Sequence, residues 1–180
     1  MGKQNIGGFV KITGGEFSGR RIRTPGGSTH PMGERERIAL FNIIMDRIQG
    51  KRVVDLYCGG GTLAIEALSR GAKSVIGVDT DKEALNVMKD NLKELGVQGE
   101  VLRSNVAKFI EETKEQFDLV MADPPYDKYA DEMVKNLGNL VSDGGILVLS
   151  HPNKSPEIEG MKLEDSRKYA GAHLSFYVKD

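Results

Sequence analysis

The tetrapeptide Asp123-Pro124-Pro125-Tyr126 follows an apolar run over 117–122 and carries groups that suit chemistry on a planar amine. The two prolines remove two backbone donors, so carbonyl oxygens stand beside the Asp123 carboxylate as acceptors. Such a cluster accepts both hydrogens of an exocyclic amino group, and Tyr126 offers a flat face on which a base stacks. We therefore predict Asp123, Pro124 and Tyr126 as catalytic residues. Standing alone, the tetrapeptide would indicate only a strand-to-loop exit. Its neighbours in the fold therefore decide between a catalytic site and a plain loop.

A second set of residues forms a ligand-binding turn upstream. An apolar run over 53–57 leads into a glycine-rich stretch, in which Gly59 and Gly61 let the backbone approach a ligand with no Cβ in the way. Asp79 ends the next apolar run, where a carboxylate accepts hydrogen bonds from both hydroxyls of a ribose. The predicted cofactor contacts beside these residues are Tyr57, Thr62, Thr80, Asn105 and Val106.

Two cofactor classes compete for this turn. The stretch 59–64 satisfies the G-x-G-x-x-A pattern of dinucleotide-binding proteins, which favours NAD. Asp55 favours the other class, because a carboxylate just before the glycines repels a pyrophosphate and suits the amino group and sulfonium of S-adenosylmethionine. We predict S-adenosyl-L-methionine as the cofactor, with an NAD-dependent oxidoreductase as the distant alternative. Asn105 has two roles open to it, a contact to the adenine edge and the N-cap of a helix that begins at Val106.

The elements that must position these residues alternate between strand and helix. Hydrophobic periodicity predicts strands over 53–57, 74–78, 100–103, 117–122 and 145–149, helices over 62–70, 81–95, 106–113 and 131–140, and a closing antiparallel pair at 161–163 and 174–178. Repeated units of this kind form a mostly parallel sheet covered on both faces, with ligands beyond the carboxyl ends of its strands. Asp55, Asp79, Asn105 and Asp123 all follow strand ends, so we expect them to meet in one crevice.

The first 50 residues form an extension to this core. Alternating residues over 9–13 and 20–24 predict a β-hairpin. Helical spacing over 34–48 predicts an amphipathic helix, with an apolar face made of Ile38, Phe41, Ile44, Met45 and Ile48. The first 52 residues hold ten Lys and Arg against four Asp and Glu, although the whole chain has a net charge of −1. This asymmetry favours a face that binds a polyanion, and a solvated basic surface is the alternative.

The composition, with 39% hydrophobic and 28% charged residues in a chain of 180, is typical of one globular domain. We predict a single domain over 1–180, with the extension at 1–50 and the catalytic core at 51–180. No apolar stretch reaches the ~20 residues that span a bilayer, and the N-terminus lacks the apolar run of a secretory signal, so we expect no membrane partner. The single cysteine, Cys58, excludes an internal disulfide and fits a reducing cytoplasm. We expect a monomer that holds no metal.

In these motifs the chain resembles the RsmD-type ribosomal RNA (guanine-N2) methyltransferases. The resemblance covers nearly the whole chain and rests on the stretches 12–20, 35–42, 55–61, 66–72, 123–126 and 167–169. It implies a class I S-adenosylmethionine-dependent methyltransferase fold, which is Rossmann-like with seven strands. It also implies methyl transfer to the N2 amine of a guanine in small-subunit (16S) ribosomal RNA, either free or in an assembly intermediate of the small ribosomal subunit.

The resemblance makes the basic residues of the extension candidates for contacts to rRNA phosphates: Arg20, Arg21, Arg23, Arg35 and Arg37. For Arg35 and Arg37, a solvated helix face or ion pairs with Glu34 and Glu36 are an equal alternative. The chain departs from the family pattern twice. His30-Pro31-Met32-Gly33-Glu34 replaces an Arg-Pro-Thr-Thr-Asp-like segment that borders the crevice, and Asn105 replaces the usual Asp after the third strand.

Other activities fit parts of the pattern. An amino-methyltransferase acting on adenine or cytosine in DNA, or on a protein glutamine, would use the same chemistry. A large target-recognition domain would favour DNA, and the chain has no room for one. A non-catalytic RNA-binding module is disfavoured by the intact acidic and glycine positions.

Overall fold

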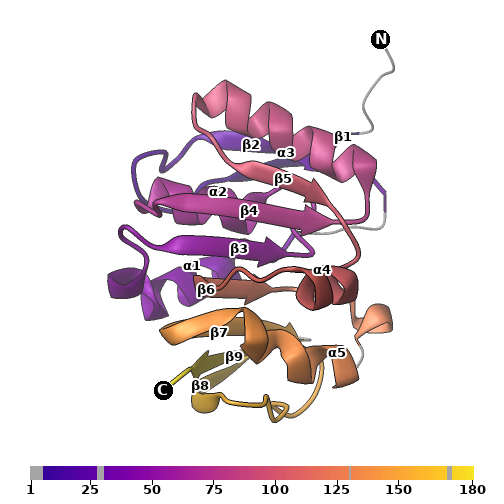
Figure 1. Ribbon diagram of the computed structural model, residues 1–180. Helices are drawn as coiled ribbons and strands as arrows, with labels where there is room; N and C mark the ends of the chain where they lie inside the picture. The colour runs from indigo at the N-terminus through magenta and orange to yellow at the C-terminus, as the bar shows by residue number, and fades with distance from the viewer. Residues whose placement is uncertain (1–5, 28–30, 130, 170–171) are drawn as a thin grey trace.

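A seven-stranded sheet forms the centre of the molecule in the computed structural model, which describes residues 6–27, 31–129, 131–169 and 172–180 (Figure 1). The strands lie in the order β5-β4-β3-β6-β7-β9-β8. In chain order they are β3 (Arg52–Leu56), β4 (Ser74–Asp79), β5 (Glu100–Arg103), β6 (Phe117–Ala122), β7 (Val141–His151), β8 (Lys162–Tyr169) and β9 (Ala172–Val178). The predicted α/β, Rossmann-like fold with seven strands is confirmed.

The strand order reverses between β3 and β6. Strand β3 pairs in parallel with β4 on one side and with β6 on the other. The chain therefore runs outward from β3 through β4 to β5 and returns to the middle of the sheet at β6. The connections on either side of such a switch point leave in opposite directions, which opens a crevice at the carboxyl ends of the strands. Strand β9 lies antiparallel between β7 and β8, as the predicted closing pair requires.

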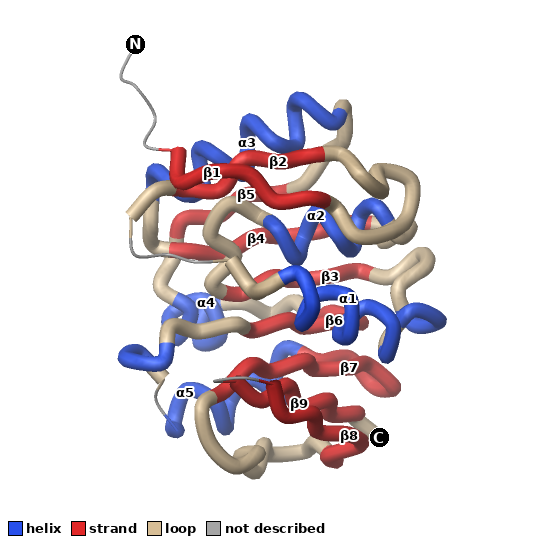
Figure 2. The backbone as a smooth tube through the Cα atoms, turned by 180° about the vertical axis from the view of Figure 1, so that it is seen from behind, coloured by secondary structure: helices blue, strands red, loops and turns tan. Residues whose placement is uncertain are grey.

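Helices cover both faces of the sheet. They are α1 (Glu34–Ile43), α2 (Thr62–Ser69), α3 (Lys82–Leu95), α4 (Val106–Glu112) and α5 (Asp131–Lys135). Figure 2 shows α1 and α2 in front of the sheet, while α4 and α5 lie on its far face. The buried apolar side chains form two clusters accordingly, one containing Phe41 and Met88 and the other containing Phe109 and Leu137. None of the helices in the described ranges is both long and apolar enough to cross a membrane.

The N-terminal hairpin packs on α3, at the β5 end of the sheet (Figure 1). Its strands are β1 (Ile6–Lys11) and β2 (Arg21–Pro25), which pair antiparallel. The side chain of Asn91 on α3 accepts a hydrogen bond from the backbone N–H of Arg23 and donates one to its carbonyl, both at 2.9 Å. A side chain that replaces a strand partner in this way fixes β2 on the helix.

The helix predicted over 34–48 is shorter than expected, and the face that it buries differs from the predicted one. It ends at Ile43, and a 3-10 turn follows over Met45–Arg47. Ile38 and Met45 were predicted on the buried face, but their side chains are 40% and 62% exposed. Arg37 is buried instead. Neighbouring residues on a helix point about 100° apart, so burial of Arg37 turns Ile38 outward.

The helix predicted over 131–140 is divided into α5 and a 3-10 turn over Asn136–Leu140. Gly138 explains the tighter turn, because a Cβ at this position would lie 2.4 Å from the carbonyl oxygen of Glu159. The backbone approaches the segment before β8 more closely than a regular helix with side chains allows.

Candidate active site

A cavity of about 1220 Å³ lies beyond the carboxyl ends of β3, β4, β6 and β7. Asp55, Asp79, Asn105 and Asp123 all line it, so the four strand ends do meet in one crevice. In Figure 1 these are the ends toward which the arrows of β3, β4 and β6 point. Its volume exceeds the ~300–1,000 Å³ of a typical single-ligand pocket. The cavity therefore has room for a cofactor and for part of an acceptor.

Asp55 lies at the N-terminus of α2, and a helix N-terminus is where dinucleotide-binding folds hold a phosphate. Its side chain is 1% exposed, and its Oδ2 accepts a hydrogen bond from the backbone N–H of Ala64 at 3.0 Å. Ala64 lies in the first turn of α2, where backbone N–H groups have no partner within the helix. Burial raises the pKa of Asp55 well above its usual range, and the charges of Asp123 and Asp79 add to the rise. A pyrophosphate would meet a carboxylate here, which disfavours the dinucleotide alternative.

Asp79 is held by the glycine-rich turn. Its Oδ2 accepts from the backbone N–H of Gly59 at 2.9 Å, and its Oδ1 accepts from that of Asp81 at 3.0 Å. A carboxylate oxygen has a second lone pair, so both oxygens still have acceptor capacity for a ligand hydroxyl.

Tyr57, directly after β3, has a φ of 59°. Such a conformation costs a non-glycine residue ~1–3 kcal/mol and is concentrated at functional sites.

Asp123 and Tyr126 meet at Ser150 near the end of β7. The Ser150 hydroxyl lies 3.3 Å from the Tyr126 hydroxyl and also hydrogen-bonds the Asp123 carboxylate. Burial raises the pKa of Asp123, and the hydrogen bond from Ser150 opposes that rise. The Tyr126 side chain is 40% exposed and lines the cavity, so one part of its ring is open to a ligand. Pro124 also lines the cavity, which brings all three residues predicted as catalytic together.

The other residues predicted to contact the cofactor line the same cavity with one exception. Those that do are Tyr57, Gly59, Thr62, Thr80, Asn105 and Val106. Asn105 is the N-cap of α4, with its Oδ1 accepting from the backbone N–H groups of Ala107 and Lys108 at 2.9 and 3.3 Å. The capping role predicted for Asn105 is therefore confirmed, and its amide nitrogen is left as a donor for a ligand.

Gly61 is the exception. It does not line the cavity, and its φ of 84° marks the residue before α2. A Cβ at Gly61 would lie 2.5 Å from Cγ of Met88 on α3. Glycine at this position serves a left-handed turn and close packing of two helices, rather than the approach of a ligand.

Sequence reasoning missed two parts of the cavity. Ser150 has the same signal as the residues that were found, since it is the first polar residue after the apolar run over 145–149. Met133 on α5 lines the cavity and lies 3.6 Å from the Tyr57 hydroxyl through its sulfur. The segment Pro31, Met32 and Gly33, followed by Glu36 on α1, forms one further wall. Residues 31–33 of the family departure therefore border the crevice, while Glu34 does not line it and His30 lies outside the described residues.

Arg37 was predicted to contact RNA, and this prediction is wrong. Its side chain is 1% exposed, and its Nε lies 3.3 Å from Oε1 of the fully buried Glu66. A buried guanidinium that is bonded to a carboxylate cannot reach a phosphate. The signal could not be seen in the local pattern, because Glu66 is 29 residues away in the sequence.

The remaining arginines of the extension differ in how free they are. Arg21 and Arg35 are exposed, and the Arg21 guanidinium lies over the Phe9 ring, 4.8 Å from its centroid. Arg20 is exposed but donates to the Glu94 carbonyl at 3.2 Å. Arg23 is engaged further, with ion pairs to Asp90 and Glu94 at 3.8 and 2.5 Å. None of the five arginines lines the cavity.

The described residues contain no group of three or more His, Cys, Asp and Glu side chains placed to hold a metal ion. Burial raises the pKa of the Cys58 thiol far above its usual range, so this cavity residue is neutral at physiological pH. The fold and the cavity together define a Rossmann-like protein with a ligand site at the carboxyl ends of its strands.

Comparison with known proteins narrows this class. The model of the family described as conserved hypothetical protein 95 matches residues 10–178. The chain is 35% identical over 128 residues to ribosomal RNA small subunit methyltransferase D of Haemophilus influenzae, an alignment that spans 68% of this chain and 66% of that protein. It is 29% identical over 142 residues to the protein of the same name from Escherichia coli, across 78% of this chain and 70% of that one. The chain belongs to the family of conserved hypothetical protein 95, the RsmD-type family.

A solved structure shows the same architecture. A hypothetical protein of Thermus thermophilus superposes with a TM-score of 0.81 at 30% sequence identity. The superposition covers 95% of this chain and 99% of that one. The likeness therefore includes the N-terminal extension as well as the sheet.

Proposed function

We propose that this protein transfers the methyl group of S-adenosyl-L-methionine to the exocyclic N2 amine of a guanine in small-subunit ribosomal RNA. The observation that carries the proposal is the meeting of two different acidic sites in one cavity. Asp55 and Asp79 lie on one side of the switch point, and Asp123 with Pro124 and Tyr126 lies on the other. The relatives named ribosomal RNA small subunit methyltransferase D support the substrate class.

The cofactor half fits S-adenosylmethionine by its donor set. Asp55 is a buried carboxylate with a raised pKa, so it favours a ligand that brings positive charge into the site. The amino group and the sulfonium of the cofactor bring that charge. The Asp79 carboxylate has acceptor capacity for the ribose hydroxyls, and the Asn105 amide nitrogen serves the adenine edge. Tyr57, Gly59, Thr62, Thr80 and Val106 complete this half of the cavity.

The acceptor half fits an aromatic amine. The lone pair of such a nitrogen is delocalised into the ring, which makes the amine a poor nucleophile. Asp123 and the Pro124 carbonyl accept hydrogen bonds from its two N–H groups, which pyramidalises the nitrogen and localises the lone pair on it. S-adenosylmethionine, when bound, supplies the electrophilic methyl group. Positioning and electrostatics are then the main contributions of the protein.

Tyr126 holds the base by stacking, and Ser150 holds Tyr126. Because the amine lies inside a cavity, the target base is flipped out of a helix or is unpaired from the start. The methylated nitrogen is strongly acidic and sheds its proton without a strong base. Asp123 is the stronger acceptor when ionised, so its raised pKa sets the lower pH limit of the reaction.

The N-terminal hairpin is proposed as the RNA-binding face. Pro25, at the end of β2, lines the cavity, so the hairpin ends beside the site. Arg21 and Lys11 form a cross-strand pair, and both are exposed. Basic side chains on such a surface contact phosphates and position the RNA without reading its sequence.

The test is methyl transfer followed by nucleoside mass spectrometry. The full chain is incubated with S-adenosylmethionine and small-subunit rRNA from a strain that lacks the protein, either naked or in 30S particles. We expect one new N2-methylguanosine. Asp123→Ala is expected to abolish transfer while calorimetry shows cofactor affinity close to that of the wild type.

Two outcomes would contradict the proposal. Methyl groups on adenine, cytosine or a protein glutamine would move the acceptor to another class of amine. Binding of NAD in place of S-adenosylmethionine would remove the cofactor assignment.

A further inference from the structure

A buried ionic cluster lies outside the machinery described above. The Glu66 carboxylate on α2 is fully buried and pairs with Arg37 on α1 and with Arg70, whose side chains are 1% and 14% exposed. The backbone N–H and the hydroxyl of Thr13 donate to Glu66 Oε1 at 3.0 and 2.9 Å. The Glu66 carboxylate therefore links the turn of the hairpin and α1 to α2.

Arg37 extends the cluster to the wall of the cavity. Its Nη1 donates to the carbonyl of Met32 at 2.7 Å, and its Nη2 donates to the carbonyl of Lys11 at 3.0 Å. Met32 lines the cavity, and Lys11 is the last residue of β1. A guanidinium presents five donors in a rigid planar fork, and here that fork reaches three separate segments at once. The single ammonium of a lysine has no such reach.

The cluster also reaches the cofactor half. Glu66 is two residues after Ala64, whose backbone N–H is bonded to Asp55. Both residues belong to α2, which is only eight residues long. Arg37 therefore joins the wall at 31–33 and the end of β1 to the helix that begins at the cofactor site. Thr13 joins the turn of the hairpin to the same helix.

We propose that Arg37 is a positioning residue, which sets the acceptor wall and the RNA-binding hairpin at a fixed place relative to the cofactor half of the cavity. It lies against neither ligand and acts through Met32, Lys11 and Glu66. The inference rests on the proposed function in one respect, namely that the wall faces the acceptor RNA. The mechanical link itself is independent of what the substrate is.

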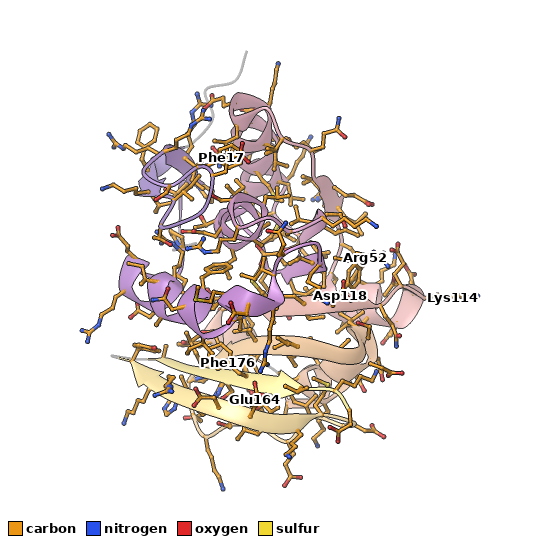
Figure 3. The ribbon with its side chains drawn as sticks, turned by 90° about the vertical axis from the view of Figure 1, so that its left-hand side faces the viewer. Phe17, Arg52, Lys114, Asp118, Glu164 and Phe176 are labelled. Carbon is orange, nitrogen blue, oxygen red and sulfur yellow. The ribbon has the colours of Figure 1, made fainter. Side chains whose placement is uncertain are left out.

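The substitution Arg37→Lys tests this role while keeping the fold. The positive charge is retained, and Glu66 keeps Arg70 and Thr13 as partners. The matched control is Arg47→Lys, because Arg47 forms a two-bond ion pair with Glu164 at 2.7 and 3.0 Å on the surface. Glu164 is labelled in Figure 3, which looks onto the amino ends of the parallel strands, on the side away from the cavity.

Two readouts are compared for the wild type and both variants. In methyl transfer, Arg37→Lys is expected to raise KM for RNA and to lower kcat/KM roughly 10- to 100-fold, since small misplacements of reacting groups have costs of that size. Cofactor affinity by calorimetry is expected to stay unchanged. In hydrogen exchange, peptides covering 31–40 are expected to exchange faster in Arg37→Lys than in the wild type, and Arg47→Lys is expected to match the wild type in both readouts.

The outcomes separate the two proposals. If the wild type fails to methylate RNA, the proposed function fails, and hydrogen exchange still decides whether Arg37 holds the wall. Unchanged exchange over 31–40 in Arg37→Lys would overturn the positioning role. An equal loss of cofactor affinity and RNA kinetics would also overturn it, because the damage would then be global.

Discussion

Glu66→Gln should lower the free energy of unfolding far more than such a small change in the side chain suggests. The change adds no bulk but removes the negative charge with which the buried Arg37 forms an ion pair, and it places an amide N–H₂ among groups that are themselves donors. Removing one partner of a buried ion pair costs about 3–5 kcal/mol, because the remaining charge is left uncompensated. In a chain of about 150–250 residues each kcal/mol lowers Tm by about 2–4 °C. We therefore expect a fall in Tm of roughly 6–20 °C.

The assays are thermal unfolding, which gives Tm, and urea unfolding of Glu66→Gln beside the control Glu164→Gln. Glu164 and Arg47 are 44% and 43% exposed, and a surface pair of this kind contributes at most about 1 kcal/mol. A lower midpoint with an unchanged m-value would show a loss of stability without a change in the unfolded state. If both variants unfold at the same midpoint, the reasoning about the buried cluster is refuted, because burial would then have made no difference.

The cavity and the hairpin give three further expected outcomes. In the wild type, the raised pKa of Asp55 means that the folded state keeps a proton that the unfolded state has released. The free energy of unfolding therefore falls as pH rises from the ordinary pKa of an aspartate to the raised one. Asp55→Asn should remove this fall in a pH series of denaturation curves and should weaken S-adenosylmethionine binding in calorimetry. Ser150→Ala removes the hydrogen bond that lowers the pKa of Asp123, so the acid limb of the kcat profile should move to higher pH, and an unmoved limb would separate Asp123 from that limb. Arg21→Gln should reduce the slope of log K for RNA against log salt by roughly 0.7–0.9, the value for one phosphate contact, while Arg23→Gln should leave the slope unchanged, since Arg23 is already paired with Glu94 and Asp90.

The sequence was sufficient to predict the sheet and the acidic residues at the carboxyl ends of its strands. Strands such as 100–103 and 117–122 have the predicted bounds, because each has an apolar centre and is followed by polar or proline residues that end it. The acidic residues of the cavity follow from a simple topological rule, that polar residues at the carboxyl ends of parallel strands meet. Ser150 obeys the same rule and was within reach of it.

The part that failed depends on contacts between distant segments. Periodicity assigned the buried stripe of α1 from apolar residues alone, so it placed Ile38 inside and Arg37 on the surface. Arg37 is buried because Glu66 and two backbone carbonyls offer it partners. Nothing near residue 37 encodes that environment. The same limit applies to Gly61, where the nearest obstacle to a Cβ is Met88 on another helix.

The way the N-terminal extension is fastened has a consequence for the order of events as the chain leaves the ribosome. The extension is synthesised before the core, and the partners that hold it come much later in the chain. Thr13 is hydrogen-bonded to Glu66, which comes 53 residues later in the chain, and Arg20 is hydrogen-bonded to the Glu94 carbonyl, which comes 74 residues later. Closing loops of this length costs chain entropy before any contact repays it. The extension is therefore held by contacts that form only after α2 and α3 have been made, and a cavity complete on the acceptor side is a late product of folding.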